Sequence, residues 1–205
     1  MGSGLYHLRI EEIRNNKPYR YYIVPVSPVG KKKKELAEQI RNYMLEQGWI
    51  YPELQEIFYC EELGYRFTNK GIIEFVGEKN AQYSHGIYFQ IEDEPTLFTA
   101  LENFGEGELV CPHCSQHYAR GEEMDIEDLL PSFDFDDEGG RLTCSACGTE
   151  DLYYCFLPSN TTDADMAYSD FAVVFPVVGE VSCSNLCKKI AEFTGIPCVT
   201  IHEVS

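Results

Sequence analysis

One apolar run does most to define the fold of this chain: Phe171-Ala172-Val173-Val174-Phe175-Pro176-Val177-Val178. A strand that is nearly all apolar is typical of the centre of a sheet, because both of its faces are buried there. A helix is expected next over residues 184–193, with Ser182 or Ser184 as its N-cap and Gly195 at its end. A last strand is predicted over residues 197–204. We therefore expect the C-terminal part to be a strand–helix–strand unit.

The start of the chain predicts a second unit of the same kind. A strand is expected over residues 19–26, paired as a hairpin with residues 5–13 across the turn Asn15-Asn16-Lys17-Pro18. A helix over residues 32–47 follows, and Gly48 is expected to end it with a left-handed cap. An apolar-Pro-apolar string precedes both this helix and the C-terminal one. True duplication and chance repetition both account for that echo.

Four further elements are predicted between these two units. They are a helix-like stretch over residues 52–63, a hairpin of residues 65–68 and 72–76, a strand over 85–91 and a helix over 95–104. Two β-α-β halves on one sheet would give an α+β fold, with a mixed sheet and its helices on one face. A ferredoxin-like arrangement is one form of such a fold.

Two cysteine pairs, Cys111-Pro112-His113-Cys114 and Cys144-Ser145-Ala146-Cys147, carry the clearest chemical signal. The two-residue spacing lets both sulfurs of a pair bind one tetrahedral metal ion, and two pairs close a four-thiolate site. We expect Cys111, Cys114, Cys144 and Cys147 to bind one structural Zn²⁺, since four thiolates leave no position for a reactive water. The alternatives are iron in a rubredoxin-like site, unligated or disulfide-linked cysteines, and His117 in place of one cysteine.

Residues 108–157 resemble the zinc-ribbon family, and the resemblance does not extend to the rest of the chain. The matching residues are Leu109-Val110-Cys111-Pro112-His113-Cys114 and Leu142-Thr143-Cys144-Ser145-Ala146-Cys147-Gly148. The resemblance implies two knuckles, in each of which backbone N–H groups point at the sulfurs. Gly148 suits the positive φ that follows the second cysteine of a knuckle. Ser115 departs from this pattern, so the first knuckle is expected to be strained or differently shaped.

The net charge of −18 is distributed very unevenly along the 205 residues. Residues 90–170 hold 20 of the 34 acidic side chains and two basic ones, Arg120 and Arg141. The remainder is neutral, with 14 acidic and 14 basic side chains. We expect residues 1–105 to form an N-terminal α/β part, 106–157 an acidic zinc-ribbon module, and 158–205 the β-α-β part that completes the main domain. So acidic a module would repel phosphates, which argues against direct nucleic-acid contact through it.

The nine cysteines and the hydropathy pattern bear on the compartment. An odd number of cysteines, four of them in metal spacing, favours a reducing cytoplasm over a secreted disulfide scaffold. No apolar run approaches the ~20 residues that span a bilayer, and no basic-then-apolar signal pattern opens the chain. A cytoplasmic, bacterial protein without a membrane segment is the expectation.

Two weaker patterns and the catalytic motifs complete the set of candidates. Cys183, Cys187, Cys198 and His202 have spacings that suit a second metal site, although buried thiols that pack a helix on a sheet are favoured. The run Lys31-Lys32-Lys33-Lys34 predicts a solvated cluster, with an anionic contact as the alternative. No nucleophile elbow, dinucleotide fingerprint, paired-His zinc motif or P-loop occurs in the sequence. No catalytic residue is therefore proposed, and the sequence leans away from an enzyme.

These observations favour a non-enzymatic zinc-binding protein. Charge concentrated on a metal-stiffened module would steer it towards a basic protein partner, as in an adaptor or an immunity-type inhibitor. The first alternative is an enzyme or a nucleic-acid-processing component in which the zinc ribbon is only structural. The second is a body that binds a small ligand beside a structural zinc.

Overall fold

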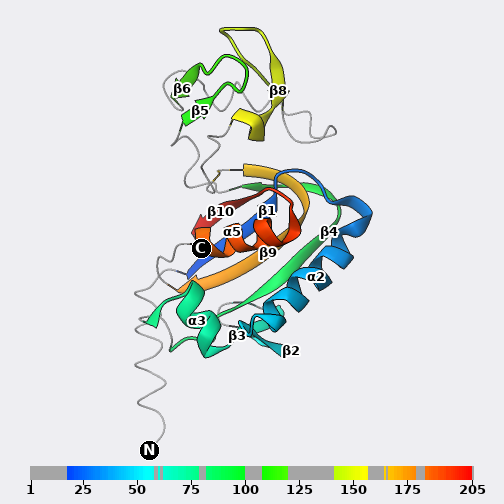
Figure 1. Cartoon of the computed structure of the whole chain (residues 1–205), viewed down its shortest axis with the longest axis vertical. Coiled ribbons are helices and arrows are strands. Elements are labelled where there is room, and N and C mark those ends of the chain that lie inside the picture. Colours follow the sequence, from blue (N-terminus) through cyan, green and yellow to red (C-terminus); the bar gives the residue numbers. More distant parts are fainter. Residues whose placement is uncertain are drawn as a thin grey trace, which may run out of the picture.

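The computed structural model describes residues 18–57, 60, 62–78, 82–99, 108–119, 141–156, 164, 166–178 and 183–204. The main body is a six-stranded sheet in the order β10-β1-β9-β4-β3-β2 (Figure 1). Its strands are β1 (Pro18–Pro25), β2 (Ile50–Glu56), β3 (Leu63–Phe67), β4 (Gly86–Thr99), β9 (Met166–Val178) and β10 (Cys198–Val204). Its helices are α2 (Lys33–Glu46), α3 (Asn69–Phe75) and α5 (Ser184–Thr194), with a 3₁₀ turn, η1 (Gly30–Lys32), before α2.

All neighbouring strands of this sheet run antiparallel, so the expected mixed sheet is wrong while the expected combination of helices and strands holds. The reason lies in how the two halves of the chain interleave. β9 and β10 run in the same direction on either side of β1, and β1 and β4 run in the same direction on either side of β9. In this part of the sheet, two strands of one half that share a direction are therefore separated by a strand of the other half, whereas β4, β3 and β2 alternate in direction along one half of the chain.

The predicted central strand is confirmed. β9 lies third in the sheet, and its residues from Phe171 to Phe175 are at most 1 % exposed. Phe171, Val173 and Phe175 pack in the core under the helices, whereas Ala172 and Val174 belong to a second apolar cluster. Because side chains alternate between the faces of a strand, β9 is buried on both of them.

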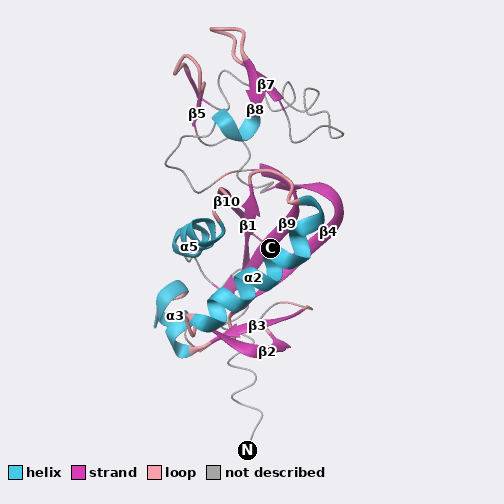
Figure 2. Cartoon of the chain, turned by 45° about the vertical axis from the view of Figure 1, so that its right-hand side comes forward, coloured by secondary structure: helices cyan, strands magenta, loops and turns pink. Residues whose placement is uncertain are grey.

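Both long helices cover the same face of the sheet, as expected (Figure 2). The buried side of α2 carries Leu36, Ile40 and Met44, and the buried side of α5 carries Leu186 and Ile190. This spacing of three or four residues places one apolar stripe of each helix on the sheet. The main core therefore lies between the helices and the odd-numbered residues of β1 and β9.

The glycines predicted to follow α2 and α5 are confirmed, whereas the predicted N-cap of α5 is not. Gly48 and Gly195 follow α2 and α5 with φ of 70° and 69°, the left-handed conformation that glycine adopts most readily. The N-cap of α5 is Cys183, which makes no side-chain capping bond, so the prediction of Ser182 or Ser184 is wrong.

The strand β1 does not have the neighbour that the predicted N-terminal hairpin would give it. Both of its edges are occupied, by β10 over Tyr19–Pro25 and by β9 over Pro18–Ile23. Residues 5–13, the other strand of the predicted hairpin, lie outside the described part of the chain. Over β1 itself, pairing with strands distant in sequence therefore replaces the expected local pairing.

The stretch between α2 and β4 contains the largest departures from the predictions. The expected helix over residues 52–63 is strand β2 up to Glu56, and β2 pairs with β3. The expected hairpin turn at residues 69–71 is the start of helix α3, which Thr68 caps by accepting a hydrogen bond from the Gly71 N–H at 3.2 Å. Gly71 is needed for packing, because a Cβ there would lie 2.1 Å from the carbonyl oxygen of Trp49.

The predicted helix over residues 95–104 is wrong up to Thr99, where β4 continues as a strand. Residues 100–107 lie outside the described part of the chain, as do residues 120–140 between the cysteine pairs. After the second cysteine pair, a short strand that ends at Leu152 is followed by a 3₁₀ turn over Tyr153–Phe156. None of the helices in the described ranges has the length and apolar character that crossing a lipid bilayer requires.

A buried carboxylate joins the start of α2 to the centre of the sheet. Asp170, on β9, is 2 % exposed and accepts hydrogen bonds from the backbone N–H groups of Val29 at 2.7 Å and Gly30 at 2.9 Å. The ammonium group of Lys33 lies 3.4 Å from the same carboxylate. Asp170 therefore has two backbone donors and one cation, which offset the cost of burying its charge.

Lys33 also contacts an irregular part of β4. The register between β4 and β9 shifts between Ile91 and Thr96, and Lys33 donates to the backbone carbonyls of Glu92 and of Asp93, the latter at 2.9 Å. An anionic contact was the alternative prediction for the lysine run. Lys33 makes such a contact, and its partner is Asp170 of the same body.

Candidate metal centre

Two small hairpins carry the cysteine pairs. The first consists of β5 (Glu108–Val110) and β6 (His117–Ala119), and the second of β7 (Arg141–Thr143) and β8 (Glu150–Leu152). Val110 pairs with His117 in the first, and Thr143 pairs with Glu150 in the second. The connections, residues 111–116 and 144–149, therefore have equal length and register, and each begins with a buried cysteine.

The two connections, here called the first and second knuckle, also share their backbone hydrogen bonds. In the first knuckle the N–H of Cys111 donates to the carbonyl of Gln116 at 2.8 Å, and that of Ser115 donates to Cys111 at 2.9 Å. In the second, the N–H of Cys144 donates to Thr149 at 2.9 Å and that of Gly148 to Cys144 at 2.7 Å. The two backbones are thus built alike.

Ser115 adopts the conformation that was expected to need glycine. Its φ is 59°, against 71° for Gly148 at the equivalent position of the second knuckle. Of the two expected alternatives, a strained first knuckle is confirmed and a differently shaped one is wrong. A left-handed backbone costs a residue with a Cβ about 1–2 kcal/mol. Among the described residues, Ser115 is the one non-glycine residue with a positive φ.

The four predicted cysteines come together between the knuckles. Their sulfurs all lie within 4.8 Å of one another, with 3.8 Å from Cys111 to Cys147 and 3.6 Å from Cys114 to Cys144. Four sulfurs arranged tetrahedrally at about 2.3 Å from one ion would be about 3.8 Å apart. A disulfide needs about 2.05 Å, so these are four free thiols that could hold a metal ion. Ligation itself stays a prediction.

Side chains bridge the two knuckles in both directions. The Tyr118 hydroxyl, on β6, lies 2.9 Å from the Cys144 sulfur in the second knuckle. A carboxylate oxygen of Asp151, on β8, lies 3.1 Å from Nε2 of His113 in the first knuckle. Neither His113 nor His117 belongs to the group of potential ligands found among the described residues.

The surroundings of the sulfurs shift the pKa values of the thiols in opposite directions. The Tyr118 hydroxyl lowers the pKa of Cys144 to about 6, and the Thr149 hydroxyl lowers the pKa of Cys147. The backbone N–H of Gln116 also lowers the pKa of Cys114, but desolvation and the neighbouring sulfurs outweigh it and raise that pKa to about 12. Four thiolates this close repel one another, so a bound cation is what would let all four ionise.

The second candidate metal group does not assemble. Cys183 and Cys187 are buried in the main core, and His202 stacks on Tyr21 with ring centroids 4.6 Å apart. Burial raises the pKa of Cys198 to about 12, which disfavours the thiolate that a metal needs. In the part of the chain that the structure describes, the only group of potential ligands is the four-cysteine cluster.

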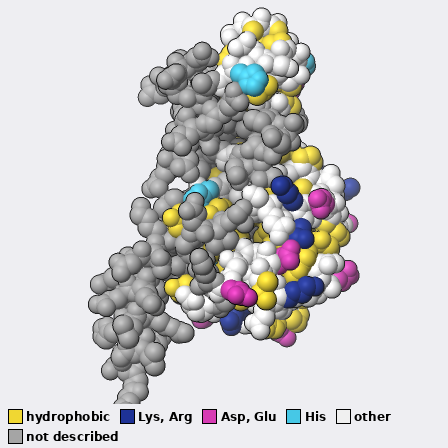
Figure 3. Space-filling model, turned by 60° about the vertical axis from the view of Figure 1, so that its left-hand side comes forward, with side chains coloured by type: hydrophobic (Ala, Val, Ile, Leu, Met, Phe, Trp, Pro, Cys, Tyr) yellow, Lys and Arg dark blue, Asp and Glu magenta, His cyan; other side chains and the backbone are white. Residues whose placement is uncertain are grey.

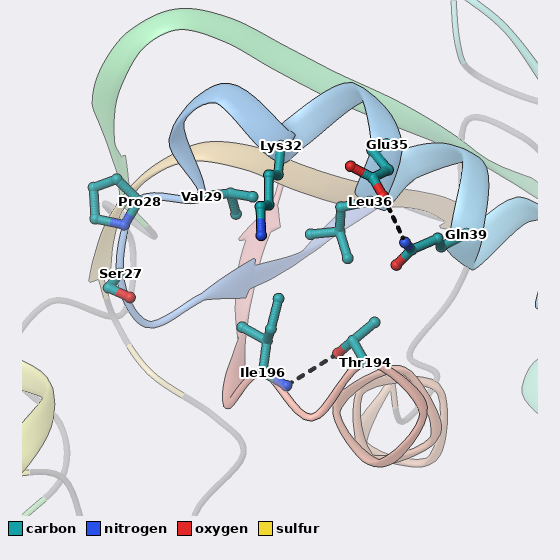
Figure 4. A pocket seen from close by; sticks show the side chains of 9 residues that line it. All are labelled: Ser27, Pro28, Val29, Lys32, Glu35, Leu36, Gln39, Thr194 and Ile196. Carbon is teal, nitrogen blue, oxygen red and sulfur yellow. Dashed lines mark hydrogen bonds between the residues drawn. The ribbon is translucent and has the colours of Figure 1, made fainter.

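A pocket of about 370 Å³ opens between the start of α2 and the end of α5 (Figure 4). Val29, Leu36 and Ile196 supply its apolar lining, and Lys32 reaches in from the lysine run. Its polar groups partly satisfy one another, since Gln39 donates to Glu35 at 3.3 Å. The pocket has the size of a small-molecule site, but its lining residues include no cysteine or histidine that could act as a nucleophile or metal ligand.

Four of the 20 acidic residues within 90–170 belong to the main body and not to the part of the chain that carries the cysteine pairs. Glu92, Asp93 and Glu94 lie on β4 in the main body, and Asp170 is buried there. Nine of the 20 acidic residues fall in residues 120–140, which join the two hairpins and lie outside the described ranges. On the face of the body seen in Figure 3, basic and acidic side chains are interspersed.

No protein-family model, curated protein or solved structure matches this chain. What it can do is therefore inferred from its own residues. The four-cysteine cluster and the uneven charge are the two features that bear on function.

Proposed function

We propose that this chain is a zinc-binding protein whose two knuckles form a zinc ribbon. The sulfur separations of 3.6 and 3.8 Å carry this proposal, because they suit one tetrahedral ion. Zinc is the preferred occupant of four thiolates, with iron as the alternative. The strand order, with β1 and β9 between β10 and β4, supports a ferredoxin-like core for the body.

The zinc would be structural. Four thiolates fill a tetrahedral coordination sphere and leave no position for a water nucleophile. Its effect would be to hold the two hairpins together, since they form separate two-stranded sheets. The ion would thereby anchor both ends of residues 120–140, because β6 ends at Ala119 and β7 begins at Arg141.

The anchored segment is the proposed contact for a basic protein partner. Residues 120–140 contain nine acidic side chains and one basic one, Arg120. Concentrated charge of one sign raises the rate of association with an oppositely charged surface. An adaptor or an immunity-type inhibitor of a basic protein would use such a segment.

The alternative is an enzyme or a nucleic-acid-processing component in which the ribbon is only structural. The pocket beside Lys32 is the feature that favours it. Lys33 is already engaged by Asp170, so the lysine run offers fewer available cations than its sequence suggests. The acidic segment would repel a phosphate backbone.

The experiment begins with metal analysis of the purified full chain, for which one zinc per chain is expected. The zinc-loaded protein is then used to capture partners from its native host, and the affinity is measured against salt concentration. Replacing Asp134, Asp136 and Asp137 by Asn should weaken binding about tenfold and flatten the salt dependence.

The matched control replaces three acidic residues of the body by Gln. These are Glu53, Glu56 and Glu62, which are exposed and carry the same total charge as the three aspartates. The control should leave both the affinity and its salt dependence close to those of the wild type. Equal effects of the two triple variants, or an affinity indifferent to salt, would contradict the proposal.

A further inference from the structure

Tyr118 contacts three consecutive residues of the opposite knuckle. Its side chain is 5 % exposed, and its hydroxyl lies 2.9 Å from the sulfur of Cys144 and 3.2 Å from the hydroxyl of Ser145. The backbone N–H of Ala146 donates to the same oxygen at 3.4 Å. A residue of the first hairpin is thus built into the second knuckle, beside one of the four sulfurs.

The chemistry of a phenol determines which group donates. A tyrosine hydroxyl has one proton to donate and lone pairs with which to accept. The Ala146 N–H can only donate, and the Ser145 hydroxyl can donate as well. A thiolate, in contrast, can only accept, so the Tyr118 proton is directed to the sulfur once Cys144 is ionised. Tyr118 is therefore a donor to Cys144.

Asp151 offers a comparison within the same module. It follows Glu150 as Tyr118 follows His117, so the two residues occupy equivalent places in the two hairpins. Its carboxylate crosses to His113 of the first knuckle at 3.1 Å. This contact is more open, with side-chain exposures of 47 % for His113 and 32 % for Asp151, and it is made to an imidazole rather than to a sulfur.

We propose that Tyr118 is a positioning residue of the metal centre, which orients the Cys144 sulfur and reduces the electron density that it donates to the ion. This inference rests on the proposed metal site. Asp151 acts as a tether between the knuckles. Groups that hydrogen-bond to metal ligands typically change metal affinity 10–100-fold when they are removed.

The test uses the full chain with Co²⁺ in place of zinc, because cobalt thiolate sites have visible and near-ultraviolet bands. Tyr118→Phe keeps the ring and removes the hydroxyl. It should shift the sulfur-to-cobalt charge-transfer band to lower energy, since the sulfur becomes a stronger electron donor. It should also weaken zinc binding about tenfold in a competition titration, because the sulfur is no longer held in place. Asp151→Asn is the control and should leave the band in place.

The outcomes separate this inference from the metal site itself. If the wild-type chain binds neither Co²⁺ nor Zn²⁺, the proposed metal site fails. If the wild type binds and Tyr118→Phe moves neither the band nor the affinity, the role of Tyr118 fails alone. Equal band shifts in both variants would also overturn it, because they would show a tether effect that needs no contact with a sulfur. Far-ultraviolet circular dichroism checks that each variant keeps its folded body.

Discussion

The main sheet and the two knuckles are held together by different means. The sheet buries apolar side chains on both faces, with β9 at its centre. In the described part of the module, the buried side chains other than cysteine are Leu109, Tyr118, Leu142 and Phe156. An apolar core this small contributes little to folding stability, and small modules are therefore commonly stabilised by a metal ion. One chain thus combines a sheet with two apolar clusters and a module that we expect to depend on an ion.

Metal removal should affect the two regions most unequally. A chelator should unfold the knuckles, because zinc contributes about 10–16 kcal/mol to the folding of small zinc peptides. The sheet should keep its structure. Hydrogen exchange would show rapid exchange of β5 to β8 and continued protection of β1 and β9. Protection of the knuckles that survives full metal removal would contradict this.

Two cysteine variants make the same comparison by mutation. Cys111→Ser should abolish stoichiometric zinc binding, since a serine hydroxyl is a poor substitute for a thiolate ligand. Cys183→Ser, at a similarly buried cysteine of the body, should retain one zinc per chain. Metal analysis after gel filtration measures both. Stoichiometric zinc retained by Cys111→Ser would show that Cys111 is not a zinc ligand.

Shortening a side chain of the central strand β9 should have the opposite effect, because it should destabilise the body and leave zinc binding intact. Phe175 is fully buried and lies edge-on to Phe67, with ring centroids 5.4 Å apart. Phe175→Ala should lower the free energy of unfolding of the body by about 3–5 kcal/mol and leave the zinc content unchanged. Ile73→Ala, at a side chain that is 65 % exposed, is the control and should change stability by less than about 0.5 kcal/mol. Denaturant unfolding measures both variants, and equal losses would mean that β9 is not the centre of the core.

Loss of the contact between Asp170 and the start of α2 should lower the free energy of unfolding by an intermediate amount. Asp170→Ala leaves two backbone N–H groups and the Lys33 ammonium without this acceptor. We expect a loss of about 2–3 kcal/mol, below the 3–5 kcal/mol of a fully buried pair because Lys33 is 15 % exposed. Denaturant unfolding of a double-mutant cycle with Lys33→Met would show coupling. Additive losses would mean that the two side chains act independently.

The sequence predicted those features that depend on local chemistry or on strong patterns. The apolar run of β9, the stripe of α2 and the glycine caps are of this kind. It failed where partners distant in sequence decide the structure. Residues 69–71 have turn chemistry, yet they begin α3, where Gly71 packs on Trp49. The Tyr118 contact with Cys144 had no local signal at all, since 26 residues separate the two.

The smallest predicted effect compares the two knuckles at a single backbone angle. Gly148→Ala should destabilise the second knuckle by about 1 kcal/mol, because the left-handed backbone is unfavourable for alanine although its Cβ would meet nothing within 4 Å. Ser115→Gly should stabilise the first knuckle by less than about 1 kcal/mol, because relief of strain is partly offset by the entropy of glycine in the unfolded chain. Zinc competition titrations would register the two substitutions as opposite changes in affinity. Changes of the same sign would show that the two knuckles, despite their matching hydrogen bonds, do not respond alike to strain at this position.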